Sequence, residues 1–128
     1  MATPEQMRET AAQHIKRGEF AQAHALCEKI LEHQPADAGA LEMLGRIAML
    51  QYRWQDAIRF FDQALSVSVD PWTLANLGNC YWKTGDLDQA DYCLRGALEL
   101  EPGFTAARVG VATVQHARRR FDEALREL

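Results

Sequence analysis

Residues 71–103 read PWTLANLGNCYWKTGDLDQADYCLRGALELEPG, and this stretch decides the fold. Apolar and small side chains recur in it at spacings of three and four residues, as in two amphipathic helices. Asp70 and Pro71 suit the N-cap and first turn of a helix. Gly85 suits the turn that ends the first helix, and Pro102 ends the second. The stretch therefore predicts a helical hairpin.

The same hairpin pattern occurs four times along the chain. In each copy a large apolar residue stands three positions before an alanine: Phe20/Ala23, Trp54/Ala57, Leu87/Ala90 and Phe121/Ala124. Successive alanines are separated by 34, 33 and 34 residues. A period of this length is typical of stacked helical units that cannot bury their apolar faces alone. The predicted units are residues 4–37, 38–70, 71–104 and an incomplete 105–128.

These units predict an all-α fold made of antiparallel helix pairs. The expected helices lie near residues 5–17, 20–33, 37–50, 54–67, 71–84, 87–99, 105–117 and 120–128. No segment alternates apolar and polar residues with the period of a strand. Gly78 and Ala90 are small, so we expect the two helices of their pair to cross closely there.

Composition limits the classes of function. The chain has 128 residues, enough for one domain, and its charged fraction of 25% is ordinary for a globular protein. A net charge of −4 gives no indication of nucleic-acid binding. No apolar run is long enough for a membrane span, and the first residues are too polar for a secretory signal. We therefore expect a cytoplasmic protein without a membrane or nucleic-acid partner.

A histidine and a cysteine stand at a spacing that suits a reactive site, but the cysteine lies at a core position. His24 stands one helical turn before Cys27, a spacing that suits a metal site or an activated nucleophile. However, Cys27 occupies a core position of its repeat, and Cys80 and Cys93 also lie in apolar helical pattern. We therefore predict no catalytic residue, no metal and no cofactor, and we expect a protein that is not an enzyme.

One motif carries a family resemblance. It consists of Leu74-x2-Leu77-Gly78-x2-Tyr81, then Ala90-x3-Leu94, then Pro102. This motif resembles the tetratricopeptide repeat, with leucine in place of the usual tryptophan, and the resemblance extends over essentially the whole chain. It implies a right-handed α-solenoid of three full repeats and most of a fourth. It also implies that the first helix of each pair lines a concave protein-binding surface.

The resemblance names candidate residues for that surface. Those of the first two units are Arg8, Ala12, Ile15, Glu42, Arg46 and Met49, and those of the last two are Trp72, Ala75, Asn76, Asn79, Trp82, Lys83, Val109, Thr113 and His116. Aromatic, amide and guanidinium groups together are typical of protein interfaces. Asn76 and Asn79 stand out, because an amide can both donate to and accept from a peptide backbone.

Two kinds of protein in this family use asparagines for binding and can be compared with Asn76 and Asn79. The run LANLGNCYWKTG, residues 74–85, resembles repeats of protein O-glycosyltransferases, whose groove asparagines hold the substrate backbone. A second variant grips the terminal carboxylate of chaperone tails with paired lysine and asparagine residues. Only Asn79 matches that clamp here, so we do not expect a carboxylate clamp.

The sequence predicts that another protein, through a peptide segment or helix, binds in the concave groove. Two alternatives stay open: the repeats recruit substrate as the N-terminal region of a larger enzyme, such as a glycosyltransferase or sulfotransferase, or they form a self-assembling scaffold. Phe121, Leu125 and Leu128 share one face of the last expected helix, with no following helix to cover it. We therefore expect a fragment of a longer array that forms homo-oligomers through residues 109–128, or frays there.

Overall fold

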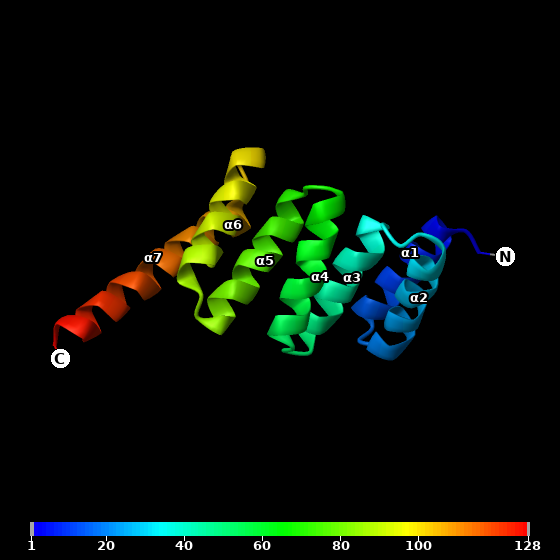
Figure 1. The fold of residues 1–128 in the computed structure, drawn as a ribbon, viewed down its shortest axis with the longest axis horizontal. Helices are drawn as coiled ribbons and strands as arrows, with labels where there is room; N and C mark the ends of the chain where they lie inside the picture. Colours follow the sequence, from blue (N-terminus) through cyan, green and yellow to red (C-terminus); the bar gives the residue numbers. More distant parts are fainter. Residues whose placement is uncertain (1, 128) are drawn as a thin grey trace. The chain divides into compact units, whose positions relative to one another are not determined.

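Seven α-helices make up the described residues, 2–127, of the computed structural model (Figure 1). They are α1 (Pro4–Lys16), α2 (Phe20–His33), α3 (Ala38–Leu50), α4 (Trp54–Val67), α5 (Pro71–Thr84), α6 (Leu87–Leu100) and α7 (Thr105–Arg126). No strand occurs among these residues, and none of the helices is long and apolar enough to cross a membrane. The fold is the predicted all-α helical repeat. The chain divides into two compact units, one through Val69 and one from Asp70.

The first unit contains two helical hairpins, α1–α2 and α3–α4. Its first helix starts at a capping box, in which the Thr3 hydroxyl accepts the Gln6 N–H and the Gln6 side chain accepts the Thr3 N–H. Both tight turns use a left-handed residue, Gly18 with φ 76° and Tyr52 with φ 62°. A side chain in this conformation is unfavourable by roughly 1–2 kcal/mol. At Tyr52 the packing of α4 against α3 offsets this strain.

The core of the first unit lies where its helices cross. Buried side chains from α1, α2 and α3 form it: Ala11, Ile15, Ala23, Cys27, Ile30, Ala40, Met43, Leu44 and Ile47. On the α3–α4 pair, a Cβ added to Gly45 would lie 2.5 Å from the ring of Phe61. Glycine at this position therefore allows the bulky ring of α4 to approach the backbone of α3.

The second unit begins with the α5–α6 hairpin that the sequence predicted. The Asp70 carboxylate accepts the Thr73 N–H at 3.0 Å and caps α5. Gly85 ends α5 with φ 87°, and Asp86 caps α6. A Cβ on Gly78 would lie 3.2 Å from the Ala90 carbonyl oxygen, so the predicted close crossing of these two helices is confirmed.

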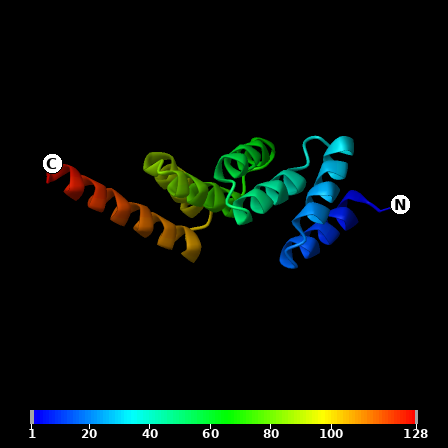
Figure 2. The same cartoon turned by 90° about the horizontal axis from the view of Figure 1, so that it is seen from below.

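One prediction is wrong: residues 105–126 form a single helix, α7, where we expected a hairpin with a break before residue 120. In Figure 2 the second half of α7 runs on past α6 as a straight continuation. Arg119, one period after Gly85, stays in the helix, whereas Gly85 has positive φ. A left-handed arginine would be strained. A helix folded back along this segment would bury few apolar side chains, so little would offset that strain.

Candidate functional site

A groove of about 450 Å³ lies on the second unit, between the facing sides of α5 and α7. Its lining residues are Asn79, Trp82, Leu94, Ala106, Val109, Gly110, Thr113 and Val114. Four of them, Asn79, Trp82, Val109 and Thr113, are among the residues that the sequence assigned to the concave surface. The structure thus brings together predicted residues from two different repeats at one hollow.

The floor of the groove is apolar and rigidly packed. Leu94 and Val114 are each about 1% exposed. A Cβ added to Gly110 would approach the Leu94 side chain to 2.8 Å, so glycine lets α7 lie close to that leucine. Val109 is 59% exposed and presents an apolar side chain at the edge of the hollow. This floor can accept an apolar side chain of a ligand.

The rim of the groove is polar on the α5 side. Asn79 lines the groove and is exposed, whereas Asn76, one turn earlier on α5, is half-buried and is not among the lining residues. Neither side-chain amide is hydrogen-bonded to another residue of the described chain. Thr113 differs, because its hydroxyl donates to the Val109 carbonyl at 2.9 Å. The Lys83 ammonium lies 4.8 Å from the Trp82 ring centroid, a cation–π contact beside the groove.

Two other predicted residues of this unit lie away from the hollow. Trp72 is 59% exposed, and its ring stands edge-on to that of buried Phe104, with centroids 4.4 Å apart. It therefore covers the start of α7 and has a packing role. His116 is exposed on α7 and does not line the groove. A contact of either residue with a partner stays a prediction.

In the first unit, the predicted polar residues are engaged in ion pairs. Arg8 forms an ion pair and hydrogen bond with the nearly buried Asp37 carboxylate, the N-cap of α3. Glu42 and Arg46 pair along α3 at 3.6 Å. Met49 is half-buried. Arg8 thus joins α1 to the start of α3, a structural role that the sequence pattern did not reveal, because the two residues are far apart in the chain.

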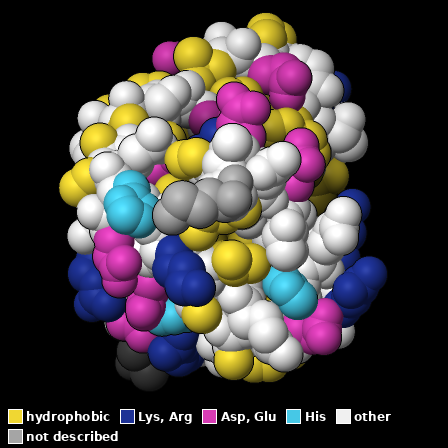
Figure 3. Space-filling view, turned by 90° about the vertical axis from the view of Figure 1, so that its right-hand side faces the viewer, with side chains coloured by type: hydrophobic (Ala, Val, Ile, Leu, Met, Phe, Trp, Pro, Cys, Tyr) yellow, Lys and Arg dark blue, Asp and Glu magenta, His cyan; other side chains and the backbone are white. Residues whose placement is uncertain are grey.

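A second hollow, of about 660 Å³, was not predicted and lies at the N-terminal end of the first unit. Its lining residues are Ala2, Pro4, Met7, Leu26, Lys29, Ile30, Glu32 and His33. Figure 3 shows this end of the molecule, where hydrophobic side chains reach the surface between charged ones. The apolar residues of this hollow lie at helical spacing on α1 and α2, so a search for uncovered helix faces could have found them.

The suspected reactive site has the surroundings of a packed core. Cys27 is fully buried, and burial raises the pKa of its thiol to about 11, so the nucleophilic thiolate is scarce near neutral pH. Burial likewise raises the pKa of Cys80 to about 12. His24 pairs with Glu28 at 3.0 Å along α2. Within residues 2–127, no three His, Cys, Asp or Glu side chains gather as a metal site requires.

Comparisons with known protein families match most of the chain to a single repeat family. Two family models, both described as tetratricopeptide repeat, match residues 14–71 and 71–104. A mitochondrial import receptor subunit, TOM70 of Saccharomyces cerevisiae, is 29% identical over 97 residues. That match covers 76% of this chain and 16% of the receptor, so the chain spans only a small part of the relative's length.

Solved structures show the same fold. An O-GlcNAc transferase mutant of Thermobaculum terrenum superposes with a TM-score of 0.83 at 22% identity, over 91% of this chain and 24% of the enzyme. The first tetratricopeptide-repeat domain of Spaghetti (RPAP3), bound to an HSP90 peptide, superposes with a TM-score of 0.84 at 16% identity, over 88% of this chain and 90% of that domain. At such identities the likeness concerns the fold alone.

Proposed function

From the premise that this chain belongs to the tetratricopeptide-repeat family, we propose that it binds a peptide segment of another protein in the groove between α5 and α7. One observation supports this most strongly: the exposed Asn79 amide, which has no hydrogen-bond partner among the described residues, lines an apolar hollow, and Asn76 stands one turn earlier on the same helix. Amide donors and acceptors around an apolar floor are the elements of a peptide site. The peptide-bound Spaghetti domain supports the proposal by analogy of fold.

The groove recognises a peptide through two kinds of contact. A ligand side chain enters the hollow above Leu94 and Val114 and buries apolar surface, which favours binding. The amides of Asn76 and Asn79, about one helical turn apart, exchange hydrogen bonds with the ligand backbone. Because backbone groups are common to all sequences, the apolar hollow supplies most of the specificity.

A second candidate function is substrate recruitment within a larger enzyme. The observation that favours it is the superposition on 24% of an O-GlcNAc transferase, since that enzyme carries the same fold in one part of a longer chain. Such repeats would still bind a polypeptide, so both candidates use the same groove. The length of the native reading frame distinguishes them, because a transferase domain needs many more residues than these 128.

We further propose that the isolated repeats are not an enzyme and need neither metal nor cofactor, and that they act in the cytoplasm. Their stability then rests on helix packing alone. Treatment with a chelator is expected to leave the helical circular dichroism and the melting temperature unchanged. A lower melting temperature after metal removal would contradict this, and fractionation of cells tests the location.

The groove is tested with a peptide selected from a random phage-displayed library against the folded chain. The double change Asn76→Ala with Asn79→Ala removes two backbone contacts of about 0.5–1.5 kcal/mol each, so binding is expected to weaken about 5- to 150-fold. Fluorescence anisotropy of the labelled peptide measures this. Thermal stability is expected to change by less than about 0.5 kcal/mol, because neither amide makes a hydrogen bond within the described residues.

The matched control is Gln89→Ala, which removes an exposed amide from α6, away from the groove. It should bind the peptide as the unchanged chain does. Full binding by the double variant would refute the groove, and equal loss in the control would show an effect unrelated to this site. A strongly lowered melting temperature of the double variant would show that the two amides are structural.

A further inference from the structure

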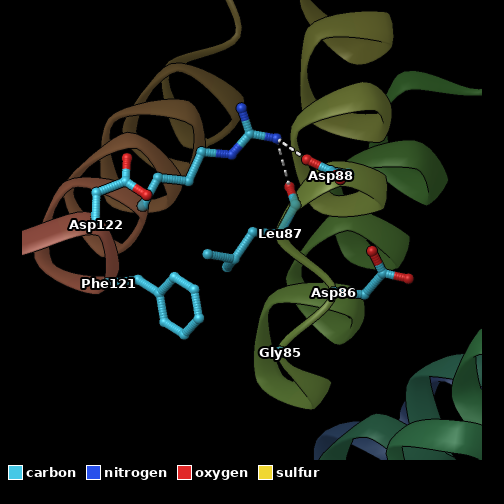
Figure 4. Close-up of a pocket in the computed structure, with 7 residues that line it drawn as sticks. Gly85, Asp86, Leu87, Asp88, Phe121 and Asp122 are labelled. Atoms are coloured by element: carbon cyan, nitrogen blue, oxygen red, sulfur yellow. Dashed lines mark hydrogen bonds and ion pairs between the residues drawn. The ribbon is translucent and has the colours of Figure 1, made fainter. Parts of the chain in front are cut away.

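The second half of α7 has the sequence of a packing helix and no helix packed on it among the described residues. Phe121 and Ala124 occupy the repeat positions of Leu87 and Ala90. Ala90 is fully buried, whereas Ala124 is exposed and Phe121 is 61% exposed. Figure 4 shows the Phe121 ring facing Leu87. Both residues line an open hollow of about 590 Å³.

The first half of α7 has the complementary surface, and it too is uncovered. In the α5–α6 pair, Gly78 lies directly under the Ala90 backbone and the Leu94 side chain. Ala112, one period after Gly78, is exposed. Position 94 of α6 corresponds to Leu128, which lies outside the described residues. Both contact surfaces of a helix pair are therefore present in one straight helix that cannot bring them together.

The spacing of these surfaces makes them complementary between two copies. Gly78 and Ala90 stand six residues on either side of Thr84, and Ala112 and Ala124 stand six residues on either side of Arg118. Two antiparallel α7 helices with a twofold axis at Arg118 would therefore bring Ala112 of one copy against Ala124 of the other. A twofold arrangement forms this contact twice.

We propose that two copies of this chain exchange the second half of α7, residues 118–126, so that this segment of each copy packs on the first half of α7 of the other, as α6 packs on α5. The occupant of each uncovered face is then a segment with Phe121 and Ala124 at the repeat positions of Leu87 and Ala90 of α6, which packs on α5 within one chain. The exchange buries the apolar side chains of Phe121 and Leu125, which are 61% and 53% exposed.

The turn position explains why exchange is favoured over closure. The three closed hairpins have a left-handed residue there, namely Gly18, Tyr52 and Gly85. Arg119 follows Gly85 by one period and lies within α7. Closure would force an arginine into the left-handed region, at a cost of roughly 1–2 kcal/mol in each chain, and exchange avoids it.

An exposed contact to α6 lies beside the hinge. The Arg118 guanidinium lies 2.5 Å from the Asp88 carboxylate and 3.5 Å from the Leu87 carbonyl oxygen (Figure 4). Near the proposed axis, the arginines at 118–120 of both copies are accompanied by Asp122 and Glu123. The basic cluster is therefore partly balanced by acidic groups on the same helix and on α6.

The test compares two substitutions at the hinge that remove the same charge. Arg119→Gly permits the left-handed turn and weakens the straight helix, so the hairpin closes within one chain. Arg119→Ala favours the straight helix and serves as the control. Light scattering over a dilution series is expected to show a dimer for the unchanged chain and for Arg119→Ala. For Arg119→Gly, the dimer dissociation constant should be about 10–100-fold larger, which means weaker association.

A second measurement reports which chains are in contact. Oxidation of the double variant Ala112→Cys with Ala124→Cys is expected to give disulfides between chains, and the addition of Arg119→Gly should give them within one chain. Several results would overturn the proposal. One is a monomer at all concentrations, and another is equal dimerisation of the glycine and alanine variants. The third is a disulfide within one chain when Arg119 is present.

Discussion

The α5–α6 pair and α7 share one repeat pattern and fold differently. In the pair, Gly85 turns the chain back and α6 covers Gly78. In α7, the same pattern runs straight through Arg119, and Ala112 is left in water. The apolar spacing is similar in both, so it does not decide between them. The comparison teaches that the residue at the turn and the apolar surface beyond it decide whether a repeat closes.

Tyr52 shows how these two factors combine. It takes the left-handed conformation without being glycine, with φ 62°. The helix that follows it buries Ala57, Ile58, Phe61 and Ala64. Burial of this size is worth several kcal/mol and exceeds the strain of one residue. The described residues after Arg119 offer Phe121 and Leu125 as their only large apolar side chains, so the balance there favours the straight helix.

The largest expected difference is between two leucine truncations, one in α6 of the closed pair and one in the second half of α7. Leu94 is about 1% exposed. A Cβ added to Gly78 of α5 or to Gly110 of α7 would lie 2.8 Å from its side chain, so leucine packs closely against both helices. Leu94→Ala is expected to lower the free energy of unfolding by about 2–5 kcal/mol. Leu125→Ala, in the open segment, should change it by less than about 0.5 kcal/mol in dilute solution. Urea denaturation measures both, and equal losses would contradict the open state of α7.

A smaller effect is expected from enlarging one alanine in each helix. Ala90→Leu inserts a bulky side chain between α5 and α6, where no space exists, and should destabilise the protein by about 1–3 kcal/mol. Ala124→Leu adds the same atoms to an exposed position and should be nearly neutral at concentrations where the chain is monomeric. If thermal denaturation shows that Ala124→Leu is the more damaging change, α7 is folded back on itself in solution.

The smallest effect is expected at the helix starts. The Asp70 carboxylate accepts hydrogen bonds from the Thr73 N–H and hydroxyl, both at 3.0 Å, whereas Phe104, the N-cap residue of α7, makes no side-chain capping hydrogen bond. Asp70→Ala should lower stability by about 1 kcal/mol, and Asp70→Asn should retain most of it, because asparagine caps equally well. Thermal denaturation of the two variants would reveal the difference. No difference would mean that solvent caps α5 as well as Asp70 does.

The candidate groove could be predicted in part. Asn79, Trp82, Val109 and Thr113 were assigned to one surface by repeat position, and they line one hollow. The pattern did not reveal Leu94 and Val114 as its floor, because both read simply as core residues. It also did not reveal the pairing of Arg8 with Asp37, which depends on how α1 and α3 approach each other.

The sequence by itself determined the helices and their pairing up to residue 104. Period, caps and turn glycines act over a few residues and agree with one another there, as do the matched small and large residues of α5 and α6. Only the tertiary structure decided whether residues 105–126 form a hairpin or one long helix. A hairpin or a long helix satisfies the local pattern of this segment equally well. The choice depends on how much apolar surface the returning helix would bury, weighed against the strain at Arg119.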